Sequence, residues 1–535
     1  MALLISDIKL PITAEETELQ SRIAKQCGFD YAYVRKLRIV RRVLDARKKS
    51  EIHFLIRAIV EMDAASERRL LQKQDDRIRP YFKTEQTALH SGSESCRGRI
   101  AIIGLGPAGL FAGLLLAQHG YAPLIIERGK PVETRVRDVE QFWLSGALQT
   151  ESNVMFGEGG AGTFSDGKLT SRSKDTRQEI VLETFQQFGA PEDILVDGKP
   201  HIGTDRLRKV VSGIRHEIER LGGEVRFSTR LTGIENKDGR LSAIHVTDAA
   251  ANMQRIAVSA VALAIGQGAR DTYRMLFDAG VAMGKKPFAV GIRMEHPQSL
   301  IDVAQYGALA GHPRLGAASY ALTSKSGVRG VYTFCMCPGG RVIASSSDVE
   351  QVVVNGMSNH ARDGQNANAA VVVQVHDADT ADHPLAGLQF VEQMERAAYI
   401  AGGGGYSAPA ERTADFLQKT KPTAFGTVIP SYRPGVMPVS LWDCLPDFVA
   451  QGVADGIVSF ARQLRGYDLG DAVLTAVETR TSAPLRILRG ENLESVSHSG
   501  LYPIGEGAGY AGGIVSAAID GLRAAERIIE RFAKP

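Results

Sequence analysis

A long uncharged segment near the first quarter of the chain limits the folds it can adopt. Residues 101–126, AIIGLGPAGLFAGLLLAQHGYAPLII, contain no Asp, Glu, Lys or Arg. A segment of this length either spans a bilayer or is buried in a protein core. Gly104, Gly106, Pro107 and Gly109 cluster near its start, which favours the second alternative: a buried strand, a tight turn, a helix and a second strand.

The turn carries a G-x-G-x-x-G pattern, whose value as evidence depends on its context. It follows a strand, opens a helix, and is followed by a second strand ending at Glu127, which is the βαβ setting of a dinucleotide site. Gly104 permits the turn, Gly106 lets a pyrophosphate approach the backbone, and Gly109 lets the helix pack on the strand. The helix N-terminus attracts the phosphates, and Glu127 accepts the ribose hydroxyls. We also assign to this site Pro107, Ala108 and Arg128.

A second glycine cluster, in NVMFGEGGAGTFSDGKL at residues 153–169, lies about 45–60 residues after the fingerprint. Glycines are costly in folded chains, so a cluster suggests backbone that bends unusually or approaches a ligand closely. We expect Gly159, Gly160 and Gly162 to cross the pyrophosphate of the dinucleotide, and its flavin ring if the dinucleotide is FAD, with Thr163 and Ser165 supplying hydroxyl groups. A mobile surface loop is the alternative.

Two further glycine turns distinguish FAD from NAD. VALAIGQGARD at 261–271 and LYPIGEGAGYAGG at 501–513 each place G-x-G after a strand, but neither has the helix, second strand and acidic residue of an independent dinucleotide site. Both resemble the accessory motifs of flavoproteins with the glutathione-reductase-like FAD fold; two ordinary turns between strands and helices are the alternative. The cofactor residues expected in or near these turns are Leu231, Gly266, Gly505, Glu506, Gly512, Gly513 and Ile514.

The chain as a whole resembles the bacterial family of uncharacterised FAD-utilising dehydrogenases. The motifs that carry this resemblance are GLGPAGL, FGEGGAGTFSDGKLTSR, LAIGQGARDT, TFCMCPGG, NANAAVVV, VETRTSAPLRI and IGEGAGYAGGI. The resemblance implies bound FAD and redox activity, and it identifies no substrate. The glycine loop has no His, Cys or Tyr between Gly157 and Lys168, so we expect FAD to be held noncovalently.

The pattern of strands and helices predicts an α/β protein with several domains. We expect a small basic α+β accessory domain at 1–83, a linker at 84–97, and a Rossmann-like FAD-binding domain of glutathione-reductase type split between 98–284 and 476–535. Residues 285–475, rich in short β-like runs, are expected to form an inserted mixed β-rich substrate domain.

Catalytic residues are unknown at this stage, with three weak candidates. Cys335 and Cys337 form a C-x-C pair that could act near the flavin, but two small buried residues at a strand end are the simpler interpretation. Arg480 could bind an anionic substrate at the domain junction, although such arginines more often form structural ion pairs. No metal site is expected.

Composition and charge limit the partners. The net charge is +3, the five cysteines indicate a reducing compartment, and no signal peptide or membrane span is expected, so we assign the protein to the cytoplasm. Residues 35–49, RKLRIVRRVLDARKK, hold eight basic residues against one acid. A solvated strand face is the usual meaning of such a run; contact with RNA or an acidic protein is the alternative.

The sequence therefore predicts an FAD-dependent oxidoreductase that passes hydride through flavin N5 to or from a small organic substrate. NAD(P)H would serve only as a transient reductant, because no second G-x-G-x-x-G unit offers a nicotinamide domain. Two alternatives stay open: a flavoenzyme acting on RNA docked by the N-terminal domain, and a regulatory protein with structural FAD.

Overall fold

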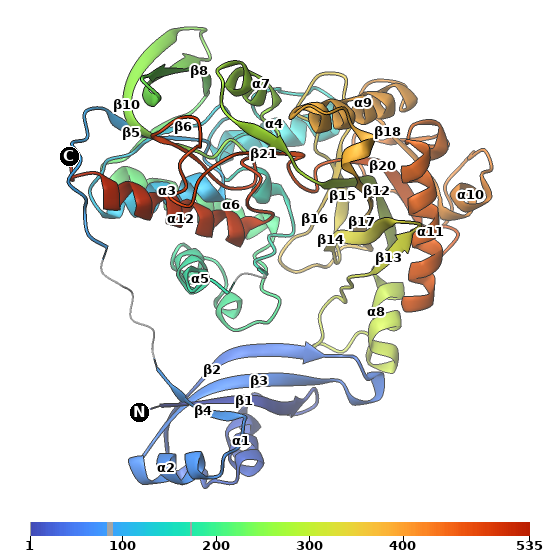
Figure 1. Ribbon diagram of the computed structural model, residues 1–535. Helices are drawn as coiled ribbons and strands as arrows, with labels where there is room; N and C mark the ends of the chain where they lie inside the picture. Colours follow the sequence, from blue (N-terminus) through green and yellow to red (C-terminus); the bar gives the residue numbers. More distant parts are fainter. Residues whose placement is uncertain (1, 83–88, 172–173) are drawn as a thin grey trace.

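The computed structural model describes residues 2–82, 89–171 and 174–535. Figure 1 shows a small N-terminal domain (blue) below a larger body, in which one sheet lies at the left and another at the right. Of the predicted linker at 84–97, residues 84–88 lie outside the described residues. The remainder is not free of contacts: Gly92 N donates to Ile529 O at 2.8 Å, and Glu94 pairs with Arg531 at 2.7 Å.

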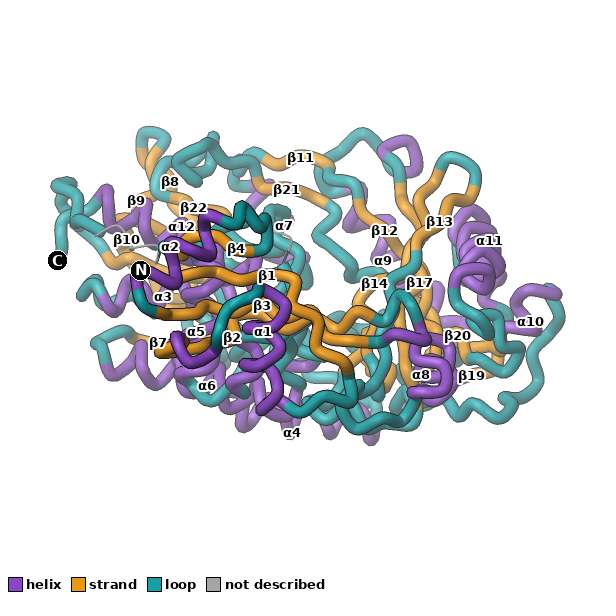
Figure 2. Tube along the Cα trace, turned by 90° about the horizontal axis from the view of Figure 1, so that it is seen from below, coloured by secondary structure: helices purple, strands orange, loops and turns teal. Residues whose placement is uncertain are grey.

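The N-terminal domain is an antiparallel sheet with both helices packed on one face. Its sheet order is β2-β3-β1-β4, and the chain order of strands and helices makes it a split β-α-β unit. Its elements are β1 (Ala2–Pro11), α1 (Leu19–Cys27), β2 (Val34–Asp45), β3 (His53–Met62), α2 (Ala64–Gln72) and β4 (Ile78–Tyr81). The basic run 35–49 lies largely on β2, at the edge of this sheet, as Figure 2 shows from below.

This domain is docked on both halves of the body. Strand β2 pairs briefly with residues 196–198: Arg42 N donates to Val196 O at 2.6 Å, and the Arg42 guanidinium meets Asp197 at 2.9 Å. On the other side, Arg314 Nη1 donates to Ile12 O at 3.0 Å. Ile12 and Ile52 belong to the largest apolar core, with Tyr306 and Leu315 of the body.

The first sheet of the body has a doubly wound core. Five strands run parallel in the order β7-β6-β5-β10-β22, and β9 and β8 continue the sheet as an antiparallel meander from the first half of β10. The strands are β5 (Arg99–Ile103), β6 (Leu124–Ile126), β7 (Glu224–Arg226), β8 (Thr229–Lys237), β9 (Arg240–Asp248), β10 (Met253–Leu263) and β22 (Leu501–Pro503). The segment 101–126 is thus β5, α3 and β6.

Helices α3, α6 and α12 share one core with this sheet. A Cβ on Gly521 of α12 would lie 2.1 Å from Ala108 O of α3. The two helices can therefore pack this closely only because residue 521 has no side chain. The helices of this half are α3 (Pro107–Gln118), α4 (Val132–Ser145), α5 (Arg177–Gln187), α6 (Thr204–Arg220), α7 (Arg270–Asp278) and α12 (Ile514–Arg531). In the described chain, no helix is both long and apolar enough to cross a bilayer.

The second sheet has the order β13-β14-β17-β12-β20-β18-β19 and is antiparallel except for β18 beside β19. Its strands are β12 (Phe288–Pro297), β13 (Thr323–Ser326), β14 (Arg329–Cys337), β17 (Asn366–Val375), β18 (Ala408–Arg412), β19 (Val436–Pro438) and β20 (Val473–Glu478). Strand β20 therefore ends three residues after the predicted domain bound at 475.

Helices and two small ribbons complete this half. The helices are α8 (Gln298–Tyr306), α9 (Ala386–Ala401), α10 (Thr413–Gln418) and α11 (Asp447–Gln463). One ribbon pairs β15 (Arg341–Ala344) with β16 (Val354–Met357). The other pairs β11 (Met283–Lys285) with β21 (Leu485–Ile487) and joins the two places where the chain passes between the halves.

We predict that deleting residues 1–90 leaves FAD binding intact, because every flavin motif lies beyond Arg97, but lowers the melting temperature of the body. Removing Ile12 and Ile52 uncovers apolar surface; each such side chain contributes about 1.5–3 kcal/mol when buried. We expect a fall of roughly 5 °C by calorimetry. The full-length Ile12→Ala/Ile52→Ala variant should reproduce part of it. An unchanged melting temperature in both would show that the domains are energetically independent.

Candidate functional site

The fingerprint glycines are required by the close contacts of the β5–α3 turn. Gly104 has φ +100°, its N–H donates to Ile126 O at 2.8 Å, and a Cβ there would lie 2.3 Å from Ala264 O. A Cβ on Gly109 would lie 1.9 Å from Gly104 O, so the start of the helix can approach the end of the strand this closely only because residue 109 has no side chain. Helix α3 starts after Gly106 with no side-chain cap, which leaves its first N–H groups for a ligand.

The second glycine cluster lies directly against this turn. Gly159 N donates to Leu105 O at 2.8 Å, and Gly160, with φ +60°, would place a Cβ 3.0 Å from Gly106 Cα. A Cβ on Gly162 would come within 3.1 Å of Ile514, at the start of α12. The loop therefore runs between the N-termini of α3 and α12.

One buried arginine holds the loop in this position. Arg135 of α4 is fully buried, and its guanidinium donates only to main-chain carbonyls. Burial lowers its pKa to about 10. The five acceptors are the carbonyl oxygens of Asn153 (2.8 Å), Val154 (2.9 Å), Gly157 (3.2 Å), Glu158 (2.6 Å) and Gly160 (3.0 Å). Arg135 was not among the residues predicted from the sequence, because a single arginine on an amphipathic helix has no distinguishing pattern.

Glu127 binds the main-chain N–H groups of the same region. Its carboxylate accepts from Leu105 N at 2.7 Å, Gly129 N at 2.8 Å and Gly157 N at 3.0 Å. The fingerprint turn, the end of β6 and the glycine loop are thus joined through one buried side chain. A carboxylate has about four acceptor positions, so capacity remains for the predicted ribose contact.

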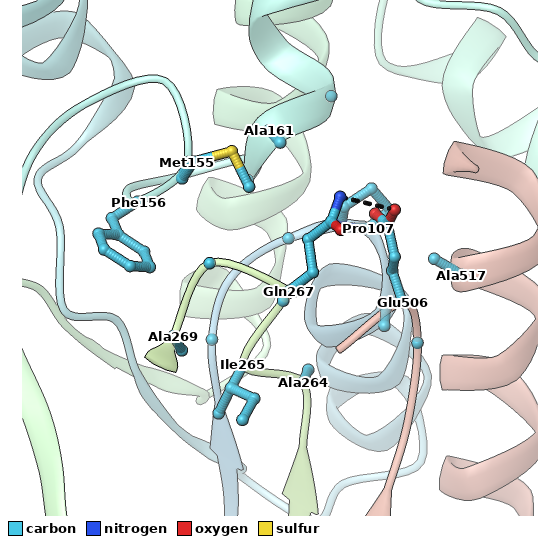
Figure 3. Close-up of a pocket in the computed structure, with 18 of the residues that line it drawn as sticks. Pro107, Met155, Phe156, Ala161, Ala264, Ile265, Gln267, Ala269, Glu506 and Ala517 are labelled. Carbon is cyan, nitrogen blue, oxygen red and sulfur yellow. Dashed lines mark hydrogen bonds between the residues drawn. The ribbon is translucent and has the colours of Figure 1, made fainter. Parts of the chain in front are cut away.

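The two later glycine turns pack against each other beneath the loop. Gly266 has φ +71°, and a Cβ on Gly507 would lie 2.6 Å from Gly266 O. The hydroxyl of Tyr273 donates to Gly507 O at 2.6 Å. Across the turns, Gln267 Nε2 donates to Glu506 at 3.0 Å, the dashed contact in Figure 3, and desolvation raises the pKa of Glu506 to about 7.

These turns and the loop enclose a cavity of about 370 Å³, within the range of small-molecule sites. Most of the residues that the sequence assigned to the cofactor line it. They are Gly104, Gly106, Pro107, Ala108, Glu127, Arg128, Gly160, Gly162, Leu231, Gly266, Gly505, Glu506, Gly512, Gly513 and Ile514. Cys335 and Arg480 line it as well, and Figure 3 shows Met155, Phe156 and Ala517 among its lining residues.

Four predicted residues lie behind the cavity wall. Gly109 serves the helix–strand contact, and the space beside Gly159 is taken by another residue of the same loop, since a Cβ there would meet Thr163 Oγ1 at 2.2 Å. The expectation that Thr163 offers its hydroxyl to the cofactor does not match this structure, since the side chain is buried and donates to Glu158 O at 3.3 Å. Cys337 is buried beyond Cys335.

Cys335 reaches the cavity because strand β14 bulges there. Phe334 pairs with Ala370 and Cys337 with Asn368, so β14 has one extra residue, and Cys335 takes a φ of +44°. Such bulges re-aim side chains. The buried Arg293 donates to Cys335 O at 2.9 Å and fixes the bulge.

The two thiols of the C-x-C pair have opposite pKa shifts. Hydrogen bonding by Cys337 holds the pKa of the Cys335 thiol well below its usual range, and the nearby Lys168 ammonium acts in the same direction. The same hydrogen bond, together with burial, raises the pKa of Cys337. Both cysteines are free thiols. Among the residues described, no group of His, Cys, Asp and Glu could hold a metal ion.

Arg128 closes the end of the cavity near Glu127. It forms ion pairs with Glu151 and Asp271, each at 2.8 Å, and its guanidinium lies 4.0 Å from the centre of the Phe156 ring. A planar cation stacked on an aromatic ring forms a flat wall, which suits an adenine or ribose more than a phosphate.

Two domain families match parts of the chain, and one known protein matches all of it. Residues 287–481 match the family described as FAD-dependent protein, C-terminal domain-like, and residues 2–61 match a domain of unknown function (DUF8436). A protein of Clostridium beijerinckii, described as uncharacterized, is 46% identical over 539 residues and covers all of both chains.

Solved structures resemble the chain only distantly. A triple mutant of the flavin-dependent brominase Bmp2 is 13% identical, covers 81% of this chain and 80% of its own, and has a TM-score of 0.37. A geranylgeranyl bacteriochlorophyll reductase-like protein of Thermoplasma acidophilum is 11% identical, covers 81% and 78%, and has a TM-score of 0.35. Scores this low establish neither a common reaction nor a common substrate.

We predict that Arg135→Met destabilises the protein by more than about 3 kcal/mol and abolishes FAD binding, because several buried carbonyls lose their donor together. Arg137→Met is the matched control: it lies on the same helix with an exposed side chain and should change stability by about 0.5 kcal/mol or less. Denaturant unfolding and FAD titration measure both. Wild-type FAD affinity in a folded Arg135→Met protein would show that the loop does not depend on this residue.

Proposed function

Because the chain belongs to a family of FAD-dependent proteins, we propose that it is an FAD-dependent oxidoreductase that exchanges hydride with a small organic substrate. The family resemblance read from the sequence motifs is thereby confirmed. One observation carries the proposal: a single cavity is lined by three separate glycine turns and by the uncapped N-termini of α3 and α12.

The cavity lining fits FAD. The uncapped start of α3, with Gly106 and Gly160 facing each other without side chains, would receive the pyrophosphate. Glu127 would accept the adenosine ribose, and Arg128 with Phe156 would border the adenine. Gly512 and Gly513 leave open space at the start of α12, where the helix dipole would stabilise negative charge on the flavin.

We also propose that the nucleotide domain is of the glutathione-reductase type, and that the second sheet is an inserted substrate domain. The support is the parallel order β7-β6-β5-β10-β22 with an antiparallel meander added to β10. In the chain, strands β5 to β10 of this sheet come before the second sheet and β22 comes after it, as expected for an inserted domain.

Bound FAD would supply a ring that accepts or donates hydride at N5. The chain contributes position and electrostatics. Phe334, Cys335 and Asn355 of the second half border the cavity. The Lys168 ammonium donates to Met336 O and lies near Cys335, which adds positive charge at the place where a substrate would meet the flavin.

We predict that the purified protein is yellow and that acid precipitation releases FAD into the supernatant. Under anaerobic conditions dithionite and NADH or NADPH should reduce the bound flavin. The loss of the oxidised-flavin absorbance band, at about 450 nm, measures this reduction. A flavin that resists every reductant would instead indicate a structural cofactor in a regulatory protein. FMN in place of FAD, or flavin kept in the pellet, would contradict the assignment.

A second candidate function, action on RNA, has one structural observation in its favour. On the sheet face opposite the helices, Arg41 pairs across strands with Arg57, and Arg38 with Ile59. Arg38, Arg41 and Arg57 are exposed and form no ion pair with the described residues. Exposed cations that have no ion-pair partner among the described residues suit a phosphate backbone, although the sheet face that carries them is turned toward the body (Figure 1).

If this face binds RNA, affinity for bulk tRNA should fall steeply between 50 and 200 mM salt, by roughly 10-fold or more for a few phosphate contacts. The Arg38→Gln/Arg41→Gln/Arg57→Gln variant should reduce both the affinity and the salt dependence. The control is the Arg68→Gln/Arg69→Gln variant. It also removes arginine charges, but from α2, on the helical side of the domain. Absence of tRNA binding at low salt would remove this candidate.

A further inference from the structure

Arg480 has a free, buried hydrogen-bonding edge at the cavity. It follows β20, where the chain returns from the second sheet to the first, and its side chain is 4% exposed. Its Nη2 donates to Ser347 Oγ at 2.8 Å and lies 3.5 Å from Asp348 and 3.9 Å from Glu395. The atoms Nε and Nη1 are buried, and neither has a hydrogen-bond partner in the described parts of the chain.

The free edge lies against backbone that carries no side chain. A Cβ on Gly268 would lie 3.4 Å from Arg480 Nη1 and 3.3 Å from Met155 Cβ, so glycine keeps this space open. Gly268, Met155 and Arg480 all line the cavity. The main chain of Arg480 is fixed as well, since Gln267 Nε2 donates to Arg480 O at 2.9 Å.

A buried guanidinium with unused donors is costly unless a ligand accepts from them. The neighbouring Arg270, in the same ionic cluster, shows the contrast. It donates to Glu395 at 2.7 Å and to Gln351 at 2.5 Å, lies 3.5 Å from Asp348, and does not border the cavity. The cluster therefore pairs Arg270, which is away from the cavity, and leaves two hydrogen-bond donors of the cavity-lining Arg480 without an acceptor in the described chain.

We propose that Arg480 is the anion-recognition residue of the substrate site and that it binds a monocarboxylate group of the substrate. Arg480 and Arg270 lie within 3.9 Å of the carboxylates of Glu395, Asp348 and Glu392, the last of which also pairs with Arg274. One added negative charge therefore costs this cluster less than the two of a phosphate group. Arg480 lies where the chain returns from the second sheet, beside Gly268, whereas the turn proposed to receive the pyrophosphate is the one at the start of α3. This inference rests on the proposed oxidoreductase function.

The test is a titration of the oxidised holoprotein with benzoate, followed both by the flavin spectrum and by the melting temperature. Benzamide, of the same shape but neutral, and inorganic phosphate are the comparison ligands. We expect saturable binding of benzoate, a much weaker effect of benzamide, and a weaker effect of phosphate. Equal effects of benzoate and benzamide, or no effect of either, would overturn the proposal.

Substitutions identify the residue. Arg480→Lys and Arg480→Gln should weaken benzoate binding by about 10- to 100-fold, as expected when hydrogen bonds to a charged group are lost. Arg270→Lys, in the same cluster, should leave benzoate affinity near wild type. Gly268→Ala, which only adds a methyl group beside Nη1, should weaken binding without disturbing the cluster and covers the case in which the Arg480 variants misfold.

Two results separate this proposal from the function on which it rests. If the flavin is never reduced but benzoate still raises the melting temperature in an Arg480-dependent manner, the anion site stands and the oxidoreductase assignment fails. If Arg480→Lys loses FAD affinity while retaining the benzoate response, Arg480 serves the cofactor and the substrate proposal is wrong.

Discussion

The hydrogen bonds from Arg135 to the glycine loop are the interaction on which the cavity depends. Residues 153–160 belong to no helix or strand, so their carbonyl groups have no regular partners, and buried carbonyls must be paired. One guanidinium supplies five donors in a fixed plane, and all of the carbonyls it reaches lie in this stretch. A cation in the core thus takes the place of a strand ladder.

Glu127 complements this arrangement with the opposite charge. Arg135 collects carbonyl groups, whereas Glu127 collects N–H groups from the fingerprint turn, from the end of β6 and from the same loop. The loop is therefore held through both the carbonyl groups and the N–H groups of its backbone. The starts of α3 and α12 have no side-chain cap, and an anion placed there is stabilised by the helix dipole.

Much of the site could be predicted from the sequence because glycine leaves a strong local signal. Gly104, Gly160, Gly266 and Gly505 all have positive φ and line the cavity. Gly104 and Gly160 were assigned to the cofactor from their glycine clusters, and Gly266 and Gly505 from the resemblance of their turns to flavoprotein accessory motifs.

Residues that act at long range could not be predicted in this way. Arg135 contacts residues 18–25 positions away, and nothing in its own helix marks it. The outward turn of Cys335 depends on a bulge, which is a property of two paired strands and not of one segment. The prediction that the Thr163 hydroxyl faces the cofactor was wrong for a related reason, because this hydroxyl donates to an acceptor inside its own loop. The free edge of Arg480 is visible only once its neighbours are placed.

The N-terminal domain touches the first half of the body through residues 196–198 and the second half through Arg314 and the core around Tyr306. The cavity lies between these same two halves. A domain fastened to both acts as a brace, because any hinge opening would have to break one of its two attachments. Because both attachments oppose a change in the spacing between the first and second sheets, a ligand would enter the cavity through small local movements of the side chains that line it.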